Sequence, residues 1–256
     1  MHPVLLSLGP VTIYSYGVMM ALSFVAAGWV IRKELQSQGD NPELASSLVL
    51  WAAVGGLIGA RLLFIVAAWS AFVADPWALL LTGAGFIWYG GLLGGIAGVS
   101  LCIRRYRLPW LRTMDMVAPA IALGHGIGRI GCHLAGDGDW GPPTGLPWGV
   151  VYSEAVVGWP HPPGVAVHPT PLYECAAYVL IFVFLRQRRT APHRPGALFW
   201  GYLVLAGLAR FGLEFVRVNP ELAFGLSMAQ VLSIPLVGLG AALLLRPAGL
   251  QQESAG

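Results

Sequence analysis

Apolar runs alternate with short polar breaks along the whole chain. Seven runs approach or exceed the length of a membrane-crossing helix: 15–31, 46–69, 86–103, 114–135, 171–185, 197–216 and 227–245. A helix needs about 20 mostly apolar residues to cross a hydrocarbon core of about 30 Å. The pattern therefore predicts an all-α integral membrane protein with about seven transmembrane helices, organised as a single domain over residues 1–256. Glycines spaced four apart in the second, third and fourth runs predict close packing of these helices.

The polar segments between the runs differ sharply in charge. Ten of the fifteen basic residues lie in three of them: 32–45, 104–113 and 186–196. The remaining segments contain none: 1–14, 70–85 and 136–170. Because short loops rich in arginine and lysine stay on the cytoplasmic side, we expect the N-terminus outside and the C-terminus, with Arg246, in the cytoplasm. The 136–170 segment, rich in glycine, proline and tryptophan, is then a periplasmic loop with a short strand near Trp148–Tyr152.

Composition excludes several classes of protein. Hydrophobic residues make up 56% of the chain and charged residues only 11%, which excludes a soluble protein. The net charge of +3 comes from the basic segments rather than from one basic surface, so we expect no nucleic-acid partner. Three cysteines without CxxC spacing support neither a disulfide framework nor a zinc site. The N-terminus lacks the basic region and cleavage site of a signal peptide, so we expect the first run to remain as a helix.

Four arginines lie inside or at the edge of apolar runs: Arg61, Arg129, Arg210 and Arg217. A guanidinium at membrane depth costs at least ~2.5–3.5 kcal/mol on insertion scales, so it faces a partner, water or a ligand. In the predicted topology Arg129 and Arg210 lie ~9 Å below the outer rim, at the rise of one residue per ~1.5 Å. Guanidinium groups suit phosphate, and the outer leaflet supplies phosphate headgroups. The alternative is a purely structural pairing with local carboxylates, for which Glu214 is the obvious partner of Arg210.

The end of the fourth run combines several groups that could bind or react. Spacings of three and four place His125, Arg129, Cys132 and His133 on one face of a helix. The glycines that follow leave backbone amides that could hold an anion. Taken alone, His125 equally fits a core histidine that is hydrogen-bonded to a neighbouring helix. The GDGDWG stretch resembles part of a calcium loop but lacks its distal glutamate, so we expect no metal site and no cofactor.

The chain resembles the prolipoprotein diacylglyceryl transferases of bacterial inner membranes. Seven motifs carry this resemblance in order along nearly the whole chain: TIYSYGVMM, GGLIGARLLF, YGGLLGG, GRIGCHLAGDGDWG, HPTPLYE, ARFGLEFVR and LSMAQVLSIP. The resemblance implies transfer of a diacylglyceryl group from phosphatidylglycerol to the lipobox cysteine of a preprolipoprotein signal peptide, at the lipid bilayer of the inner membrane. Glycerol phosphate leaves, and the acceptor supplies the thiol.

The resemblance also implies roles for individual residues. Arg129 and Arg210 match the phosphate clamp. Further positions match those that bind substrate or shape the site: Tyr16, Asp139, Gly141 and Glu214. His168 and Glu174 brace the periplasmic loop, and Arg217 assists at the rim. We include Arg61 and Cys132 among the substrate-binding candidates.

Two positions depart from the family pattern. Tyr89 stands where the third-run motif usually has a histidine that is a base candidate, and Cys132 stands where the family usually has an asparagine. A phenol is a poor proton acceptor at neutral pH. We therefore hypothesise that His125 or His133 takes over proton transfer, with Tyr89 retained as a catalytic candidate. Alternatively, the arginines alone lower the pKa of the incoming thiol.

Three other functions use the same residues. A transporter or flippase for an anionic solute or lipid headgroup would use the arginines as a binding site. A structural scaffold would pair them with carboxylates: Glu214, Asp139 and Glu174. A divergent transferase would act on another acceptor.

Overall fold

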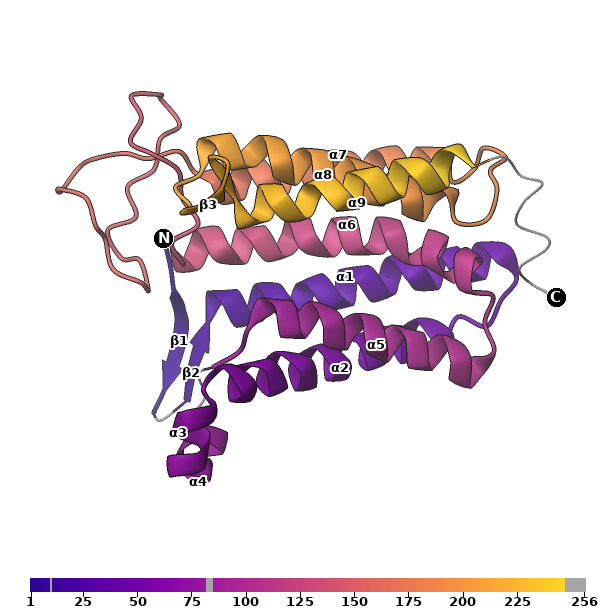
Figure 1. Cartoon of the computed structure of the whole chain (residues 1–256), viewed down its shortest axis with the longest axis horizontal. Coiled ribbons are helices and arrows are strands. Elements are labelled where there is room, and N and C mark those ends of the chain that lie inside the picture. Colours follow the sequence, from indigo (N-terminus) through magenta and orange to yellow (C-terminus); the bar gives the residue numbers. More distant parts are fainter. Residues whose placement is uncertain (10, 82–84, 247–256) are drawn as a thin grey trace. The chain divides into compact units, whose positions relative to one another are not determined.

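The computed structural model describes residues 1–9, 11–81 and 85–246. Within these residues, each predicted apolar run coincides with a long helix (Figure 1). These helices are α1 (Ser15–Gln38), α2 (Leu44–Ala67), α5 (Trp88–Tyr106), α6 (Trp110–Ala135), α7 (Thr170–Arg188), α8 (Ala197–Leu213) and α9 (Met228–Leu245). The prediction of a helical protein is therefore confirmed.

Four helical segments of the described chain are both long and apolar enough to cross a membrane. They are Ser15–Gln38, Leu44–Ala67, Ala197–Val216 and Met228–Leu245. The last part of Ala197–Val216 is the short helix η1 (Glu214–Val216), which continues α8. The protein thus has the character of a multi-pass membrane protein. The other long helices are less apolar because they contain polar groups such as His125 and Arg129 in α6 and Glu174 in α7.

Several short elements lie in segments that the apolar pattern assigned to loops. An antiparallel hairpin of β1 (Val4–Leu8) and β2 (Val11–Tyr14) precedes α1. A second hairpin joins β3 (Glu221–Ala223) to β4 (Leu226–Ser227). Two short helices, α3 (Trp69–Ala74) and α4 (Pro76–Leu81), occupy much of the predicted 70–85 loop, of which residues 82–84 lie outside the described residues. Elements of this length are too short to stand out as separate runs of hydrophobic residues.

Contacts along the backbone divide the chain into two compact units. The first comprises Met1–Ala27 and Met114–Gly256, and the second comprises Gly28–Thr113. The predicted single domain therefore stays a prediction, and each unit is described by itself.

The second unit is held together by a glycine contact between α2 and α5. A Cβ atom added at Gly55 or Gly59 would fall on the carbonyl oxygen of Gly94 or Gly90 in the facing helix. Gly98 lies in the same way against the carbonyl of Trp51. The predicted close packing is thus confirmed for the second and third runs. In the fourth run it fails at Gly128, where an added Cβ would meet nothing within 4 Å.

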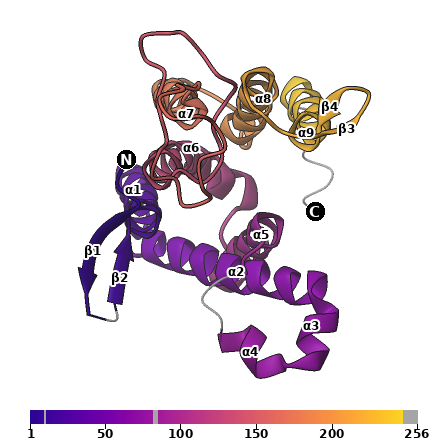
Figure 2. The ribbon, with the colours of Figure 1, turned by 90° about the vertical axis from the view of Figure 1, so that its left-hand side faces the viewer.

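Arg61 organises the end of this unit. Its guanidinium donates hydrogen bonds to the carbonyl oxygens of Leu80, at 3.0 Å, and Gly85, at 3.2 Å, and to that of Leu79. The ring of Phe86 lies 5.4 Å from its central carbon. Carbonyls at the C-terminal end of a helix lack partners within the helix, so Arg61 satisfies those of α4. Figure 2 shows α3 and α4 extending from the end of α2.

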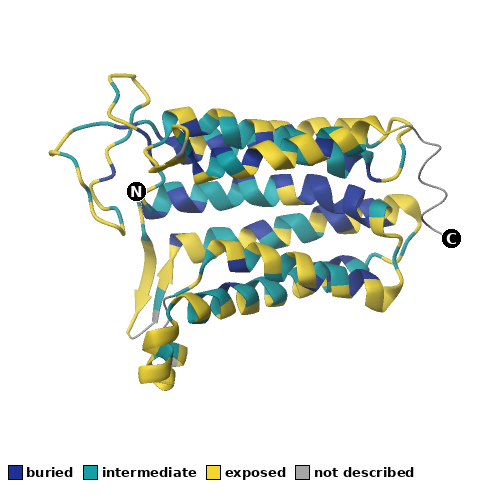
Figure 3. Cartoon of the chain, viewed as in Figure 1, coloured by how far each residue is buried: buried dark blue, intermediate teal, exposed yellow. Residues whose placement is uncertain are grey.

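The first unit has its core between α6, α7 and α8. Buried side chains from the three helices form it: Ala118, Ala122, Tyr178, Ile181, Leu185, Leu198 and Tyr202 (Figure 3). Asp115 of α6 accepts hydrogen bonds from the backbone amides of Gly196, at 2.6 Å, and Phe199, at 2.9 Å. This carboxylate therefore satisfies free amides at the start of α8.

The α6–α7 loop, residues 136–169, projects beyond the ends of both helices (Figure 1). It has a small core of its own, made by Trp140, Tyr152 and Val167. Val150 and Val167 pair by two backbone hydrogen bonds of 3.0 Å, and this bridge is what the structure shows of the predicted strand at Trp148–Tyr152. The loop is thus a folded segment.

We expect Gly94→Ala to lower the stability of the protein. The new methyl group would fall on the carbonyl oxygen of Gly55, and overpacking of this kind costs roughly 1–3 kcal/mol. Gly201→Ala in α8 is the matched control, because an added Cβ there meets nothing within 4 Å. Thermal unfolding of both variants in detergent measures the difference. An unchanged melting temperature for Gly94→Ala would contradict the close contact of α2 and α5.

Candidate functional site

The last turns of α6 present three polar side chains to one another. The Nε atom of Arg129 lies 3.4 Å from Nε2 of His125, and its Nη1 atom lies 3.7 Å from the sulfur of Cys132. The predicted helix face therefore exists for these three residues. His133 instead forms a hydrogen bond through Nδ1 with the hydroxyl of Tyr152, at 2.9 Å, and so contacts the small core of the α6–α7 loop.

The Tyr152 hydroxyl is enclosed by this loop core. Burial raises the pKa of Tyr152 above its ordinary value, and the nearby charge of Asp137 raises it further. The hydroxyl therefore keeps its proton at neutral pH and can donate it to His133. This contact ties the loop to the end of α6.

Arg129 is held by two carboxylates from different segments. Its Nε atom lies 3.0 Å from Oε2 of Glu174 in α7, and its Nη1 atom forms an ion pair with Oδ2 of Asp139 in the α6–α7 loop. The other oxygen of Glu174 lies 3.1 Å from Nε2 of His125. Two helices and a loop thus meet at one guanidinium.

Arg217, just beyond η1, binds the same two carboxylates. Its Nη1 atom lies 3.2 Å from Oε2 of Glu174, and its Nη2 atom pairs with Oδ1 of Asp139. Its Nε atom lies 3.8 Å from Oε2 of Glu214, which also pairs with Arg210 one helical turn earlier. Shared carboxylates therefore connect all three arginines.

We call these six residues the arginine–carboxylate cluster: Arg129, Arg210, Arg217, Asp139, Glu174 and Glu214. Three guanidinium groups face three carboxylates, so the formal charges cancel. The inner members are almost fully buried, with side-chain exposures of 1–5%: Glu174, Glu214 and Arg217. The others form an accessible edge, at 18% for Arg129, 21% for Arg210 and 28% for Asp139. The cluster is therefore rigid inside and accessible at one edge.

The backbone around Asp139 is fixed by the start of α7. The hydroxyl of Thr170 donates a hydrogen bond to the carbonyl oxygen of Asp139. The amide of Gly141 donates to the carbonyl of His168, at 2.9 Å. A Cβ atom at Gly141 would fall on the carbonyl oxygen of Val216, so only glycine fits. Gly141 and His168 thus position the loop, and the Gly141 amide that could have held an anion is already used.

Tyr16 lies beside the same end of α6. A Cβ atom at Gly131 would lie 3.4 Å from the Cα atom of Tyr16, so the glycine lets α1 approach α6. The tyrosine side chain is 41% exposed, and its hydroxyl is within electrostatic reach of Asp137 and Arg129. Tyr16 therefore adds a hydroxyl next to the accessible edge of the cluster.

Two of the predicted site residues belong to the other compact unit. Tyr89 is in the first turn of α5, where it is 42% exposed and meets Trp88 edge-on at 5.2 Å between ring centroids. Arg61 holds the carbonyls at the end of α4 described above. Roles for these two residues in binding or catalysis stay predictions.

Asp137 is a neighbour of the cluster that sequence reasoning did not select. Its Oδ1 atom accepts a hydrogen bond of 3.3 Å from the amide of Asp139. Cys132, Asp137 and Asp139 each place one potential ligand atom within 4.8 Å of the others, a spacing that a metal ion could use. Both oxygens of Asp139 are already paired with arginines, however. The acidic GDGDWG motif was the available signal for Asp137.

Two further residues support the cluster from its edges. The ring of Tyr178 stacks on that of His125, with centroids 3.8 Å apart and planes 9° apart. The amide group of Asn219 donates a hydrogen bond to Oε1 of Glu214. Tyr178 lies four residues after Glu174 on α7, which is a helical spacing that could have indicated it.

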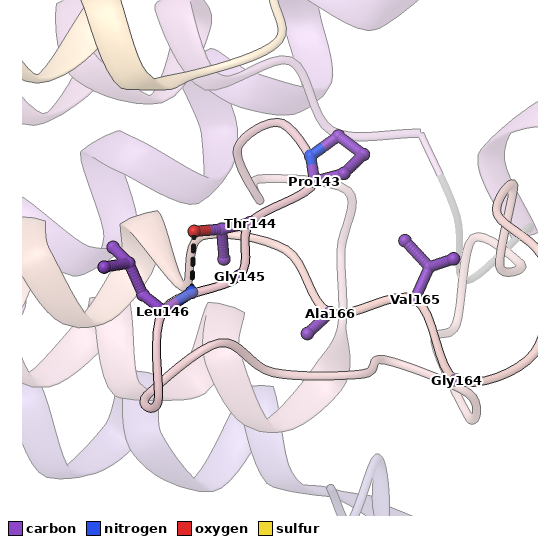
Figure 4. A pocket seen from close by; sticks show the side chains of 7 residues that line it. All are labelled: Pro143, Thr144, Gly145, Leu146, Gly164, Val165 and Ala166. Atoms are coloured by element: carbon purple, nitrogen blue, oxygen red, sulfur yellow. Dashed lines mark hydrogen bonds between the residues drawn. The ribbon is translucent and has the colours of Figure 1, made fainter.

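A shallow pocket also opens in the α6–α7 loop (Figure 4). Seven uncharged residues line it: Pro143, Thr144, Gly145, Leu146, Gly164, Val165 and Ala166. Because it contains no charged side chain, it offers no counterpart to a phosphate. The arginine–carboxylate cluster is the better candidate for chemistry.

Fold and site together define a helical, multi-pass membrane protein with a buried, arginine-rich polar centre. The chain belongs to the prolipoprotein diacylglyceryl transferase family, whose family model matches residues 3–246. The resemblance seen in the seven motifs is therefore confirmed.

Relatives of known name match nearly the whole chain. A phosphatidylglycerol–prolipoprotein diacylglyceryl transferase of Clostridium tetani (strain Massachusetts / E88) is 32% identical, over 94% of this chain and 95% of that protein. One of the same name from Chromohalobacter salexigens is 34% identical, over 94% and 90%. A third, from Nitratidesulfovibrio vulgaris (strain DSM 19637 / Miyazaki F), is 36% identical, over 99% and 96%.

Glu174→Gln should destabilise the protein strongly. Glu174 is 1% exposed and pairs with both Arg129 and Arg217. Removing one partner of a buried ion pair costs roughly 3–5 kcal/mol, because the remaining charge loses its compensation. The matched control is Glu154→Gln, an exposed carboxylate of the α6–α7 loop. Equal melting temperatures for the two variants would show that the ion pairs of Glu174 do not hold the site together.

Proposed function

We propose that the protein transfers the diacylglyceryl group of phosphatidylglycerol to the lipobox cysteine thiol of preprolipoproteins. The names of the relatives support this substrate pair. The observation that carries the proposal within the molecule is the accessible edge of the arginine–carboxylate cluster, where Arg129 and Arg210 are partly exposed.

The geometry of the cluster suits a phosphate leaving group. When the incoming sulfur attacks the diacylglyceryl carbon, the bond from that carbon to the phosphoester oxygen breaks, and glycerol phosphate leaves with one more negative charge. Guanidinium groups placed where this charge develops stabilise the transition state. Arg129 and Arg210 are the members of the cluster that reach its edge, so they serve as the clamp. Arg217 is 5% exposed and holds the carboxylates behind them.

The site lies near one end of its helices, which agrees with a lipid headgroup as substrate. Arg129 precedes the last residue of α6 by six positions, and Arg210 precedes the last residue of η1 by six. At ~1.5 Å per residue each lies ~9 Å from its helix end. We place these ends at the outer face of the bacterial inner membrane. In this proposal the seven long helices cross the bilayer, with the N-terminus outside and the C-terminus in the cytoplasm.

Three groups near Arg129 could accept the proton of the incoming thiol. His125 lies between Glu174 and the ring of Tyr178, which restricts its movement. His133 is joined to Tyr152. Asp139 is the most exposed carboxylate of the cluster. Tyr89, at the position of the family's histidine, has no counterpart to these contacts in its own surroundings of the described α5 start.

The scaffold alternative predicted the observed ion pairs with Glu214, Asp139 and Glu174. Family membership nevertheless favours an enzyme, because the relatives are named as transferases. The two alternatives differ in what an arginine substitution removes. A scaffold would lose stability, whereas an enzyme loses turnover while it stays folded.

Purified protein with phosphatidylglycerol and a lipobox peptide should give a peptide with one added diacylglyceryl group in mass spectrometry. Arg129→Lys should reduce turnover by roughly 10²-fold or more, because lysine keeps the charge but loses the paired donors. Arg188→Lys, at an exposed position of α7, is the matched control and should act like the wild type. No adduct from the wild type, under conditions in which a relative produces one, would contradict the proposed function.

A further inference from the structure

We propose that the carboxylate of Asp139 occupies the phosphate position in the resting site and becomes the proton acceptor for the thiol once the phosphate displaces it. This inference rests on the proposed function and deepens it. It gives one residue two successive tasks, which are to hold the arginines apart from solvent anions and then to deprotonate the acceptor.

The first observation is how the two oxygens of Asp139 are used. Oδ2 pairs with Arg129, and Oδ1 pairs with Arg217. A carboxylate that bridges two guanidinium groups makes the same contacts that two oxygens of a phosphate would make. An arriving headgroup must therefore compete with Asp139 for these donors.

The second observation is that Asp139 alone among the three cluster carboxylates can leave. Its side chain is 28% exposed, compared with 1% for Glu174 and 2% for Glu214. Its backbone is held by Thr170 through its carbonyl oxygen. The side chain can therefore rotate away from the arginines while the loop stays in place.

The third observation concerns the surroundings of Asp139. A carboxylate oxygen of Asp139 lies within 4.8 Å of the Cys132 sulfur and of an oxygen of Asp137. A carboxylate that has lost two guanidinium partners and lies beside a second carboxylate binds a proton more readily. Displacement by phosphate thus produces a proton acceptor only when the lipid is in place.

The reaction then balances without any further reactant. The proton of the acceptor thiol passes to Asp139, and the sulfur forms a bond to the diacylglyceryl carbon. The bond from this carbon to the phosphoester oxygen breaks, and its electron pair leaves with glycerol phosphate, held by Arg129 and Arg210. When glycerol phosphate departs, Asp139 releases its proton to water and returns to the arginines.

Asp139→Asn separates the two tasks, because an amide has nearly the same shape but no charge. Its NH₂ group cannot pair with a guanidinium, so glycerol phosphate should bind about tenfold more tightly or better, as expected for loss of a competing charged hydrogen bond. Turnover with phosphatidylglycerol and the lipobox peptide should fall by roughly 10²-fold or more, the usual contribution of a general base. A residue with a purely structural role would not give tighter binding together with slower transfer.

The full-length protein in detergent or lipid nanodiscs allows both measurements, by calorimetric titration with glycerol phosphate and by mass spectrometry of the peptide. Glu154→Gln removes one charge from the same loop and should leave both values unchanged. Unchanged or weaker binding of glycerol phosphate to Asp139→Asn overturns the bridging role, and unchanged turnover overturns the role as base. Loss of transfer in the wild type would instead overturn the proposed function.

A second variant keeps the test valid if Asp139→Asn does not fold. Asp139→Glu retains both the charge and the proton acceptor, so its turnover should stay within about tenfold of the wild type. A loss of roughly 10²-fold, with an unchanged melting temperature, would count against Asp139 as the base.

Discussion

Charge compensation among three arginines is the constraint on which the first unit depends. A guanidinium group away from water is tolerated only when its charge and donors are matched. Here the matching carboxylates come from three places that are far apart in the sequence: the α6–α7 loop, the start of α7 and the end of α8. Glu174 serves Arg129 and Arg217 at once, so neither arginine can move without the other. The ion pairs therefore determine how these segments meet.

The same compensation sets a condition on activity. A cluster whose formal charges cancel has no excess positive charge with which to attract an anion over a distance. Binding must then depend on exchanging one anionic partner for another at short range. Exposure differs along the cluster in the way this exchange requires, because Asp139 and the two outer arginines reach the edge while Glu174 and Glu214 remain enclosed. Stability and binding thus use separate carboxylates of one network.

Much of the architecture could be predicted from the sequence because long apolar runs have few alternatives in a membrane. The proximity of His125, Arg129 and Cys132 was equally accessible, since helical spacing alone brings them together. The partners of Arg217 were not, because Glu174 and Asp139 lie 43 and 78 positions away in the chain. The direction of His133 depended on Tyr152, in a loop whose composition suggested little order. Short elements such as α3 and β1 lack the length that makes a periodic pattern readable.

The α6–α7 loop carries one more implication, which concerns variation between related proteins. Val150 and Val167 are joined by two hydrogen bonds, so the sixteen-residue excursion between them begins and ends at the same place. Lengthening such a closed excursion changes its closure entropy only slowly, by about 0.6 kcal/mol for each doubling. Insertions should therefore accumulate beyond the bridge, whereas the stretch from Gly136 to Gly141 tolerates none, because any shift there would move the carboxylate that meets both arginines.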